Sequence, residues 1–203
     1  MKITCIGHSG FLVQIGEYNL IFDYYTDEKN VITSEVFKGK KTCVLASHNH
    51  HDHYNAKVFE WAGLGDVMYV LENDCKALGE ALHIGVGDEV SMFDGAVHIR
   101  AYGSTDEGVS FLVKVDGVTM FHAGDLNDWH WDGEMSASEL SEMEESYLSV
   151  LGELVGEQIN VAFIPVDPRL GVHAGRGRDG FERVVGAEKI VPMHFSGNDG
   201  VEC

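Results

Sequence analysis

The feature that most constrains the fold is a short apolar run that ends directly in a cluster of histidines. The run covers residues 42–46 (TCVLA), and the residues that follow it read SHNHHDHYN up to Asn55. A run this short, apolar and rich in β-forming residues predicts a buried strand. Asn55 can cap a helix over residues 56–61. The histidines are therefore expected where a core strand passes into a helix.

The spacing of these side chains predicts a metal site. Alternate residues leaving a strand point the same way, so His48 and His50 can share one ion. Asp52 and His53 follow at the turn and can face a second ion beside the first. Imidazole nitrogen and carboxylate oxygen are ligands of zinc, and manganese or iron also accepts them. His51 has the opposite parity and is expected in solvent or behind the ligands.

The alternative interpretation of this stretch is a polar loop that happens to be rich in histidine. Ordinary loops favour Gly, Asn, Asp and Ser, and they rarely continue a buried strand with His-x-His-x-Asp-His. We therefore favour metal binding.

Two later strand ends carry the same types of ligand. Asp125 follows a predicted strand in an Ala-Gly-Asp context, and His194 follows an apolar Val-Pro-Met run. Taken alone, such residues are more often turn formers or half-buried polar groups. Beside a metal cluster at a neighbouring strand end, both become predicted ligands. His8 and Asp23 also lie at expected strand ends, where they either hold ligands in place or stabilise a turn.

The remaining pattern predicts alternating strands and helices in one domain, residues 1–203, with 44% hydrophobic residues to build its core. A GxGxxG match at 175–180 lies too far past its strand to bind a dinucleotide, and we expect a basic flexible lip there. Expected strands cover 1–6, 11–15, 18–23, 67–71, 90–93, 97–102, 109–115, 118–122, 160–166 and 189–193; expected helices cover 74–82, 136–156 and a short stretch from Phe181.

The charge balance narrows the class of partner. Asp and Glu number 33 against 14 Lys and Arg, a formal charge of −19. Such a surface repels phosphate backbones and anionic lipid, so we expect neither nucleic-acid nor membrane binding. A small-molecule substrate, including an anionic one, remains compatible with a metal-lined pocket. We see neither a signal peptide nor CxxC spacing, and we expect a reducing, cytoplasmic compartment.

These residues together resemble the metallo-β-lactamase superfamily. The resemblance rests on His48-x-His50-x-Asp52-His53, on Ala-Gly-Asp125 and on Val-Pro-Met-His194. The N-terminal Gly-His-Ser-Gly-Phe-Leu stretch is similar to a single-domain branch of metal-dependent hydrolases that includes L-ascorbate-6-phosphate lactonase-like proteins. The resemblance implies an α/β fold, a four-layer αββα sandwich with the metals at one edge of the two sheets.

The resemblance also implies a division of ligands between two ions. His48 and His50 would serve the first ion, whereas Asp52, His53 and His194 would serve the second, with Asp125 between them. The family places a further histidine at the position of Gly103, which has no side chain. Either Asp106, His130 or His8 replaces that histidine, or one ion is held mainly by Asp52, His53, Asp125 and His194.

The chemistry implied is hydrolysis by metal-activated water. A bound zinc ion lowers the pKa of its water towards about 7, and the hydroxide attacks a carbonyl or phosphoryl centre. Asp52 is the expected catalytic residue, because it can orient the hydroxide or accept its proton. Asp106, His130 and Arg169 are candidate substrate-binding residues, although a structural ion pair would equally explain Arg169. The alternatives are an iron oxidoreductase of the same fold and a non-catalytic metal-binding module.

Overall fold

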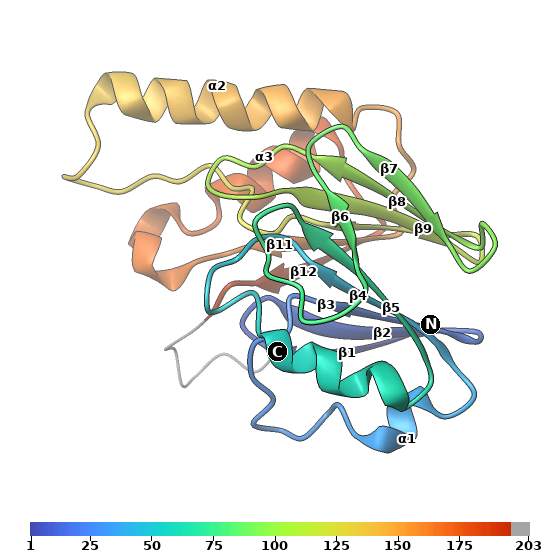
Figure 1. Cartoon of the computed structure of the whole chain (residues 1–203). Helices are drawn as coiled ribbons and strands as arrows, with labels where there is room; N and C mark the ends of the chain where they lie inside the picture. Colours follow the sequence, from blue (N-terminus) through green and yellow to red (C-terminus); the bar gives the residue numbers. More distant parts are fainter. Residues whose placement is uncertain (196–203) are drawn as a thin grey trace.

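Two six-stranded sheets face each other in the computed structural model, which describes residues 1–195 (Figure 1). In both sheets, strands that follow one another along the chain are also neighbours in the sheet. The first sheet contains β1 (Lys2–Gly7), β2 (Gly10–Ile15), β3 (Tyr18–Phe22), β4 (Lys41–Ala46), β5 (Asp66–Glu72) and β6 (Leu82–Ile84). The second contains β7 (Glu89–Met92), β8 (Val97–Tyr102), β9 (Ser110–Val115), β10 (Val118–His122), β11 (Val161–Pro165) and β12 (Lys189–Met193).

Helices cover both outer faces of this sandwich (Figure 1). The helix α1 (Ser34–Phe37) and the 3-10 helix η1 (Ala56–Gly63) lie against the first sheet, and α2 (Ala137–Glu153) and α3 (Arg176–Val184) lie against the second. A second 3-10 helix, η2 (Pro168–His173), follows β11. The predicted αββα fold class is confirmed.

The main core lies between the sheets, where side chains from the inner faces interdigitate. Phe11 of the first sheet and Phe163 of the second meet with ring centroids 4.5 Å apart. A second cluster, including Val44 and Tyr69, fills the space under η1. Val44 and Leu45 are buried although they point to opposite faces, which explains why the run at 42–46 is apolar throughout.

Strand direction gathers polar residues at one edge of the sandwich. The strands β3, β4 and β5 run parallel in the first sheet, and β10, β11 and β12 run parallel in the second. Side chains that follow β3, β4, β10, β11 and β12 therefore meet at one edge, because parallel strands all end there.

The predicted helix at 74–82 is wrong. The chain makes a turn after β5 and then enters β6. The side chain of Glu72 accepts a hydrogen bond from the backbone N–H of Asp74 at 2.9 Å, and the Glu72 carbonyl accepts one from Cys75 at 3.0 Å. These local bonds satisfy the backbone in a turn that competes with a helix.

The predicted flexible lip at 175–180 is also wrong, because this segment belongs to α3, which begins five residues before the predicted start. Gly177 and Gly180 are buried in that helix. A Cβ at Gly177 would lie 1.8 Å from Asn127 Oδ1, and one at Gly180 would lie 3.1 Å from Tyr147 Cε1. The glycines thus allow α3 to pack closely against its neighbours.

Two other expected helices are present with changed details. Residues 56–63 form a 3-10 helix, and the Asn55 side chain caps it by accepting from the backbone N–H of Lys57. The long helix α2 begins with a capping box in which Ser136 and Glu139 satisfy each other's backbone N–H groups. Among residues 1–195, no helix is long and apolar enough to cross a membrane.

Candidate metal centre

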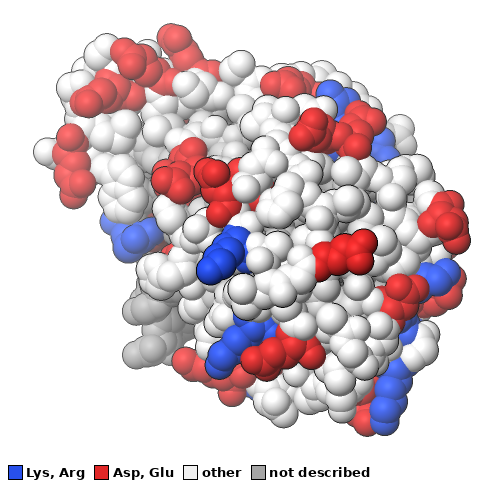
Figure 2. Space-filling view, in the orientation of Figure 1, with Lys and Arg blue, Asp and Glu red and all other residues white. Residues whose placement is uncertain are grey.

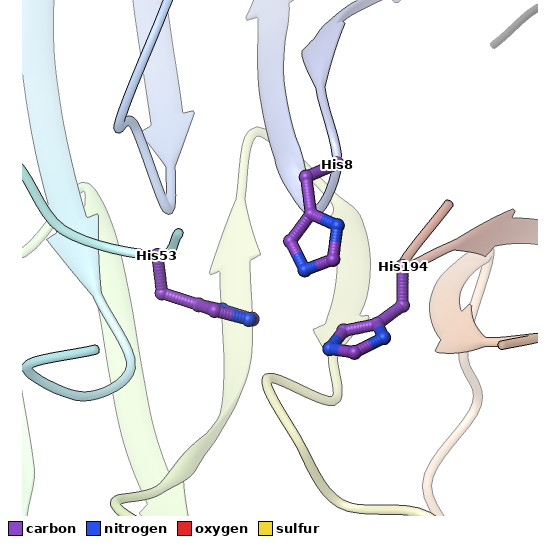
Figure 3. A group of neighbouring side chains, drawn as sticks. All are labelled: His8, His53 and His194. Atoms are coloured by element: carbon purple, nitrogen blue, oxygen red, sulfur yellow. The ribbon is translucent and has the colours of Figure 1, made fainter. Parts of the chain in front are cut away.

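Histidine and carboxylate side chains from both sheets converge at the edge where the parallel strands end. His8, His53 and His194 form one group and His48, His53 and Asp125 form another, with the ligand atoms of each group within 4.8 Å of one another. All five residues are buried. Figure 3 shows the rings of His8, His53 and His194 pointing toward one another from the β1–β2 turn, the loop after β4 and the end of β12.

Asp125 belongs to the second group and also contacts a histidine of the first group, His194. Its Oδ1 is 3.1 Å from His53 Nε2 and 3.3 Å from His194 Nε2. Its Oδ2 is 3.4 Å from His48 Nε2. One carboxylate therefore faces imidazoles on both sides, which is the arrangement a bridging ligand requires.

The centre contains polar atoms that are buried without a hydrogen-bond partner among the described residues. His53 Nε2 and Asp125 Oδ1 are two of them, although they are only 3.1 Å apart. Their contact is thus electrostatic rather than a well-directed hydrogen bond. Buried polar atoms almost always have partners, and imidazole nitrogen with carboxylate oxygen is a donor set that zinc and related ions accept. The residues present therefore fit a metal ion.

The crowding of titratable side chains in the centre shifts their pKa values. Burial disfavours the imidazolium of His53, but the adjacent carboxylates of Asp125 and Asp23 outweigh burial and raise the pKa of His53 to about 10. Burial likewise opposes ionisation of Asp125, but His194 and His53 hold its pKa well below the usual range. His8 differs, because burial and then the neighbouring His194 lower its pKa to about 3. A cation would replace the protons that now balance the Asp125 carboxylate.

Asp23, after β3, holds two of the histidines in place. Its Oδ2 lies 2.8 Å from His53 Nδ1, which directs the Nε2 of that ring into the centre. Asp23 also accepts hydrogen bonds from the N–H and hydroxyl of Ser47 at 2.8 and 2.7 Å. The Ser47 hydroxyl is in turn 3.0 Å from His48 Nδ1. These hydrogen bonds are the ones that the ligand-positioning interpretation of Asp23 requires.

Asp167, after β11, does the same for His194. Its Oδ2 lies 3.0 Å from His194 Nδ1, and both of its oxygens accept hydrogen bonds from Arg169 Nε at 3.0 and 2.8 Å. Arg169 thus forms the structural ion pair that was the alternative to substrate binding. Sequence reasoning missed this role of Asp167, although an aspartate directly after an apolar strand is the same signal that identified Asp125.

Three residues of the centre have left-handed backbone conformations that non-glycine residues rarely adopt. The φ angles are 50° at His8, 42° at Asp23 and 72° at His194. The backbone N–H of His194 donates to the His8 carbonyl at 3.1 Å, which joins the β1–β2 turn to the end of β12. Strained backbone of this kind concentrates at functional sites, where the surrounding fold maintains it.

His50 and Asp52 lie at the rim and are members of neither group. His50 Nδ1 is 3.0 Å from His48 Nε2, and its Nε2 is 3.3 Å from Glu107 Oε2, a neighbour that the sequence did not indicate. Asp52 Oδ2 is 3.5 Å from His8 Nε2. His51 is directed into solvent, with its side chain 96% exposed.

His8 was one of three substitutes considered for the family histidine of the first ion, the ion assigned to His48 and His50. The structure instead groups His8 with His53 and His194, the residues assigned to the second ion. A Cβ at Gly103 would lie 3.2 Å from Val150 Cγ2, so a side chain at this position would begin against α2. The second substitute, His130, pairs instead with Asp132, 3.3 Å away.

A cavity of about 180 Å³ opens beside the centre. Trp129 and Trp131 contribute parallel rings with centroids 6.0 Å apart, and Trp129 Nε1 donates to the Asp125 carbonyl at 3.0 Å. The candidate substrate-binding residue Asp106 lines this cavity, whereas His130 and Arg169 do not. The lining residues are Thr105, Asp106, Asp125, Trp129, Trp131, Met143 and His194.

Acidic residues are widely spread over the molecular surface. Figure 2 shows them gathered along α2 and scattered over the rest of the same face, with Lys and Arg in isolated positions. This distribution agrees with the formal charge of −19.

The chain is similar in sequence or in fold to several known proteins. The chain is 27% identical to a metal-dependent hydrolase of Pelotomaculum thermopropionicum, over 97% of this chain and 85% of the relative. It matches the structure of a protein from Parabacteroides distasonis proposed to be a metal-dependent hydrolase, with TM-score 0.68, 19% identity and coverage of 97% and 83%. A metallo hydrolase of Ignicoccus hospitalis matches with TM-score 0.64, 17% identity and coverage of 96% and 82%.

The similar solved structures show only the fold of the chain. A family model shows which superfamily the chain belongs to. The model of the β-lactamase superfamily domain matches residues 2–137, which is more than half of the chain. The matched region contains the histidine cluster and Asp125, and the remaining strands complete the second sheet. The chain therefore belongs to the β-lactamase superfamily and has the metallo-β-lactamase fold.

Proposed function

We propose that this protein is a metal-dependent hydrolase that acts on a small ester, lactone or phosphodiester. The observation that carries the proposal is Asp125, a buried carboxylate between two groups of histidines, with its Oδ1 and His53 Nε2 buried and lacking hydrogen-bond partners among residues 1–195. The relative from Pelotomaculum thermopropionicum carries the same general activity in its name. Lactones enter the substrate class through the resemblance to the lactonase-like branch.

The proposed ligands are the six predicted residues together with His8. One ion would be held by His53, His194 and His8. The other ion would be held by His48, and Asp125 would be shared by both ions. His50 and Asp52 lie close enough to the rim of the centre to complete the two sites after side-chain rotation. We favour zinc, in one or two copies, and manganese or iron fits the same donors. The ion would supply an activated water and polarise the bond to be cleaved.

The chain's own residues would orient the reactants. Asp52 is proposed to accept the proton of the attacking water, because its carboxylate lies next to His8 at the open side of the centre. Asp23 and Asp167 keep the rings of His53 and His194 aimed inward. The rings of Trp129 and Trp131 would exclude water from one side of the bound substrate.

The size and charge of the cavity limit the substrate. A volume of about 180 Å³ suits a small molecule rather than a polymer. Arg169 is engaged by Asp167, and Asp106 adds a carboxylate to the lining. An anionic substrate would consequently have to bind the metal through its negatively charged group. The formal charge of −19 supports a substrate other than nucleic acid, and we infer a cytoplasmic site of action.

The test combines metal analysis with an activity panel. Purified protein is expected to contain a divalent transition metal and to hydrolyse at least one member of a panel of lactones, carboxylic esters and phosphodiesters. Asp125→Asn should lose the metal and the activity together. Asp52→Asn should reduce kcat by about 100-fold or more. His51→Ala, in the same loop but directed into solvent, is the matched control and should behave as the wild type.

Two results would contradict the proposal. Iron accompanied by oxygen uptake would favour the oxidoreductase alternative. Stable metal binding without hydrolysis across the panel would favour the non-catalytic module.

A further inference from the structure

A second group of metal-binding side chains lies outside the buried centre. His130, Asp132 and His173 place one ligand atom each within 4.8 Å of one another. His130 Nε2 is 3.3 Å from Asp132 Oδ1, and His173 Nε2 is 3.2 Å from Asp132 Oδ2. The two imidazole rings have centroids 3.9 Å apart. The group shares no residue with the centre around Asp125.

The spacing of this group is compatible with a tetrahedral ion. Two ligand atoms bound at about 2 Å to a tetrahedral zinc ion are separated by roughly 3.3 Å. Each imidazole lies close to that distance from one carboxylate oxygen of Asp132, His130 from Oδ1 and His173 from Oδ2. Two imidazoles and one carboxylate leave a fourth position for water. Mixed nitrogen and oxygen donors favour zinc, nickel or copper over magnesium or calcium.

The three residues come from two separate segments. His130 and Asp132 belong to the connection between β10 and α2, and His173 is the last residue of η2. Trp131, between the first two, lines the cavity, and the Arg169 guanidinium of η2 lies 5.4 Å from the centre of its ring. Without an ion, the exposed side chain of Asp132 would be the main polar link between these segments.

We propose that His130, Asp132 and His173 bind a divalent transition-metal ion such as Zn²⁺, and that this ion fastens the wall of the cavity to η2. The ion would hold Trp131 between two ligands of the same loop. It would also hold η2, whose Arg169 supports Asp167 and, through it, His194. This site would stabilise the position of the cavity wall rather than take part in the reaction.

The experiment is a zinc titration of chelator-treated full-length protein by isothermal calorimetry, with zinc content measured after gel filtration. The wild type is expected to bind about one more Zn²⁺ per chain than His173→Gln. Asp132→Asn should weaken the same binding event by at least tenfold. His83→Gln removes another exposed histidine, on β6, and should match the wild type. All three substituted side chains are at least partly exposed, and circular dichroism would verify folding of each variant.

Equal zinc stoichiometry and affinity in the wild type, His173→Gln and Asp132→Asn would overturn the proposal and leave an ordinary surface ion pair.

Hydrogen exchange tests whether the ion holds the wall of the cavity to η2. Zinc should slow amide exchange of residues 130–135 in the wild type and leave it unchanged in His173→Gln. Zinc binding with no change in exchange at 130–135 would overturn that part of the proposal.

Discussion

Asp23 is the residue on which the orientation of both His48 and His53 depends. It reaches His53 directly and His48 through the Ser47 hydroxyl. Asp23 is fully buried and has a left-handed backbone, which few residues other than Gly, Asn and Asp adopt readily. The consequence is that metal affinity should respond to a residue that touches no metal.

We expect Asp23→Asn to weaken metal binding by roughly 10- to 100-fold, because an amide cannot accept the His53 N–H and both Ser47 donors as a carboxylate does. Competition with a chromogenic chelator would measure the change. Asp66→Asn, an exposed aspartate at the start of β5, is the matched control. Unchanged affinity in Asp23→Asn would mean that Asp23 only stabilises the turn.

The same residue predicts a pH dependence of stability in the metal-free protein. Burial opposes ionisation of Asp23, but the charges of His122 and His53 and a hydrogen bond from His53 outweigh it and lower its pKa to about 2. A lowered folded-state pKa gives stability that is present above the ordinary value, near 4, and is lost as pH falls towards 2. The contribution is about 2 kcal/mol.

Urea unfolding of metal-free protein between pH 4 and pH 2 would measure this loss. Asp23→Asn should be less stable than the wild type at pH 5, and the difference should shrink as the pH falls. A difference that stays constant over this range would contradict the assignment.

Residue-level prediction from sequence was strongest where strand ends converge. His48, His53, Asp125 and His194 all lie in the centre as expected, because each follows a recognisable apolar strand. His50 and Asp52 belong to the same motif but lie at the rim, where their partly exposed side chains contact His48 and His8. His8 could be named only as a substitute, because its position depends on a left-handed turn and on contact with the end of β12.

At the scale of elements, α3 forms because its glycines pack closely against neighbouring elements, although the intrinsic helix propensity of glycine is low. Its glycine-rich start has low helix propensity, and the sequence indicated a mobile segment. Burial of Gly177 against Asn127 and of Gly180 against Tyr147 outweighs that preference. The Tyr147 hydroxyl donates to the Gly177 carbonyl at 2.7 Å, which joins α2 to α3.

Gly177→Ala should therefore destabilise the protein by about 1–3 kcal/mol, because the added methyl group would overlap Asn127. Gly152 in α2 is a matched control, since a Cβ there meets nothing within 4 Å. Gly152→Ala should stabilise by up to about 1 kcal/mol. Urea denaturation of both variants gives the comparison. Equal effects of the two substitutions would contradict the packing argument.

Strands and the long helix were predictable because their hydrophobic periodicity agrees with their tertiary environment. Residues 42–46, 97–102 and 118–122 are all strands in the structure, and Ser136 caps α2 as its sequence indicates. The segment 74–82 was not predictable in the same way. Its structure depends on hydrogen bonds that Glu72 accepts from Asp74 and Cys75, which compete with a helix of similar local preference.

At the scale of the whole molecule, the centre joins the two halves of the sandwich. His8, His48 and His53 follow strands of the first sheet, whereas Asp125 and His194 follow strands of the second. A bound ion would cross-link the sheets, and its binding energy would add to the free energy of unfolding.

Removing metal with a chelator should thus lower the unfolding temperature, and returning zinc should restore it. Zinc at 100 times its dissociation constant should add about 2.7 kcal/mol to the free energy of unfolding. Thermal unfolding with increasing zinc measures the effect. His51→Ala should respond as the wild type does, and Asp125→Asn should respond far less. An equal response in Asp125→Asn would mean that stabilising zinc binds elsewhere.

The hydrogen bond from His194 to the His8 carbonyl connects the last strand of the second sheet to the turn after the first strand of the chain. A ribosome must therefore synthesise the chain past residue 194 before these two histidines can meet. Until then, the emerging chain offers only the local cluster at 48–53. An ion held by the complete centre would consequently report that the segments around residues 8 and 194 have reached their final places.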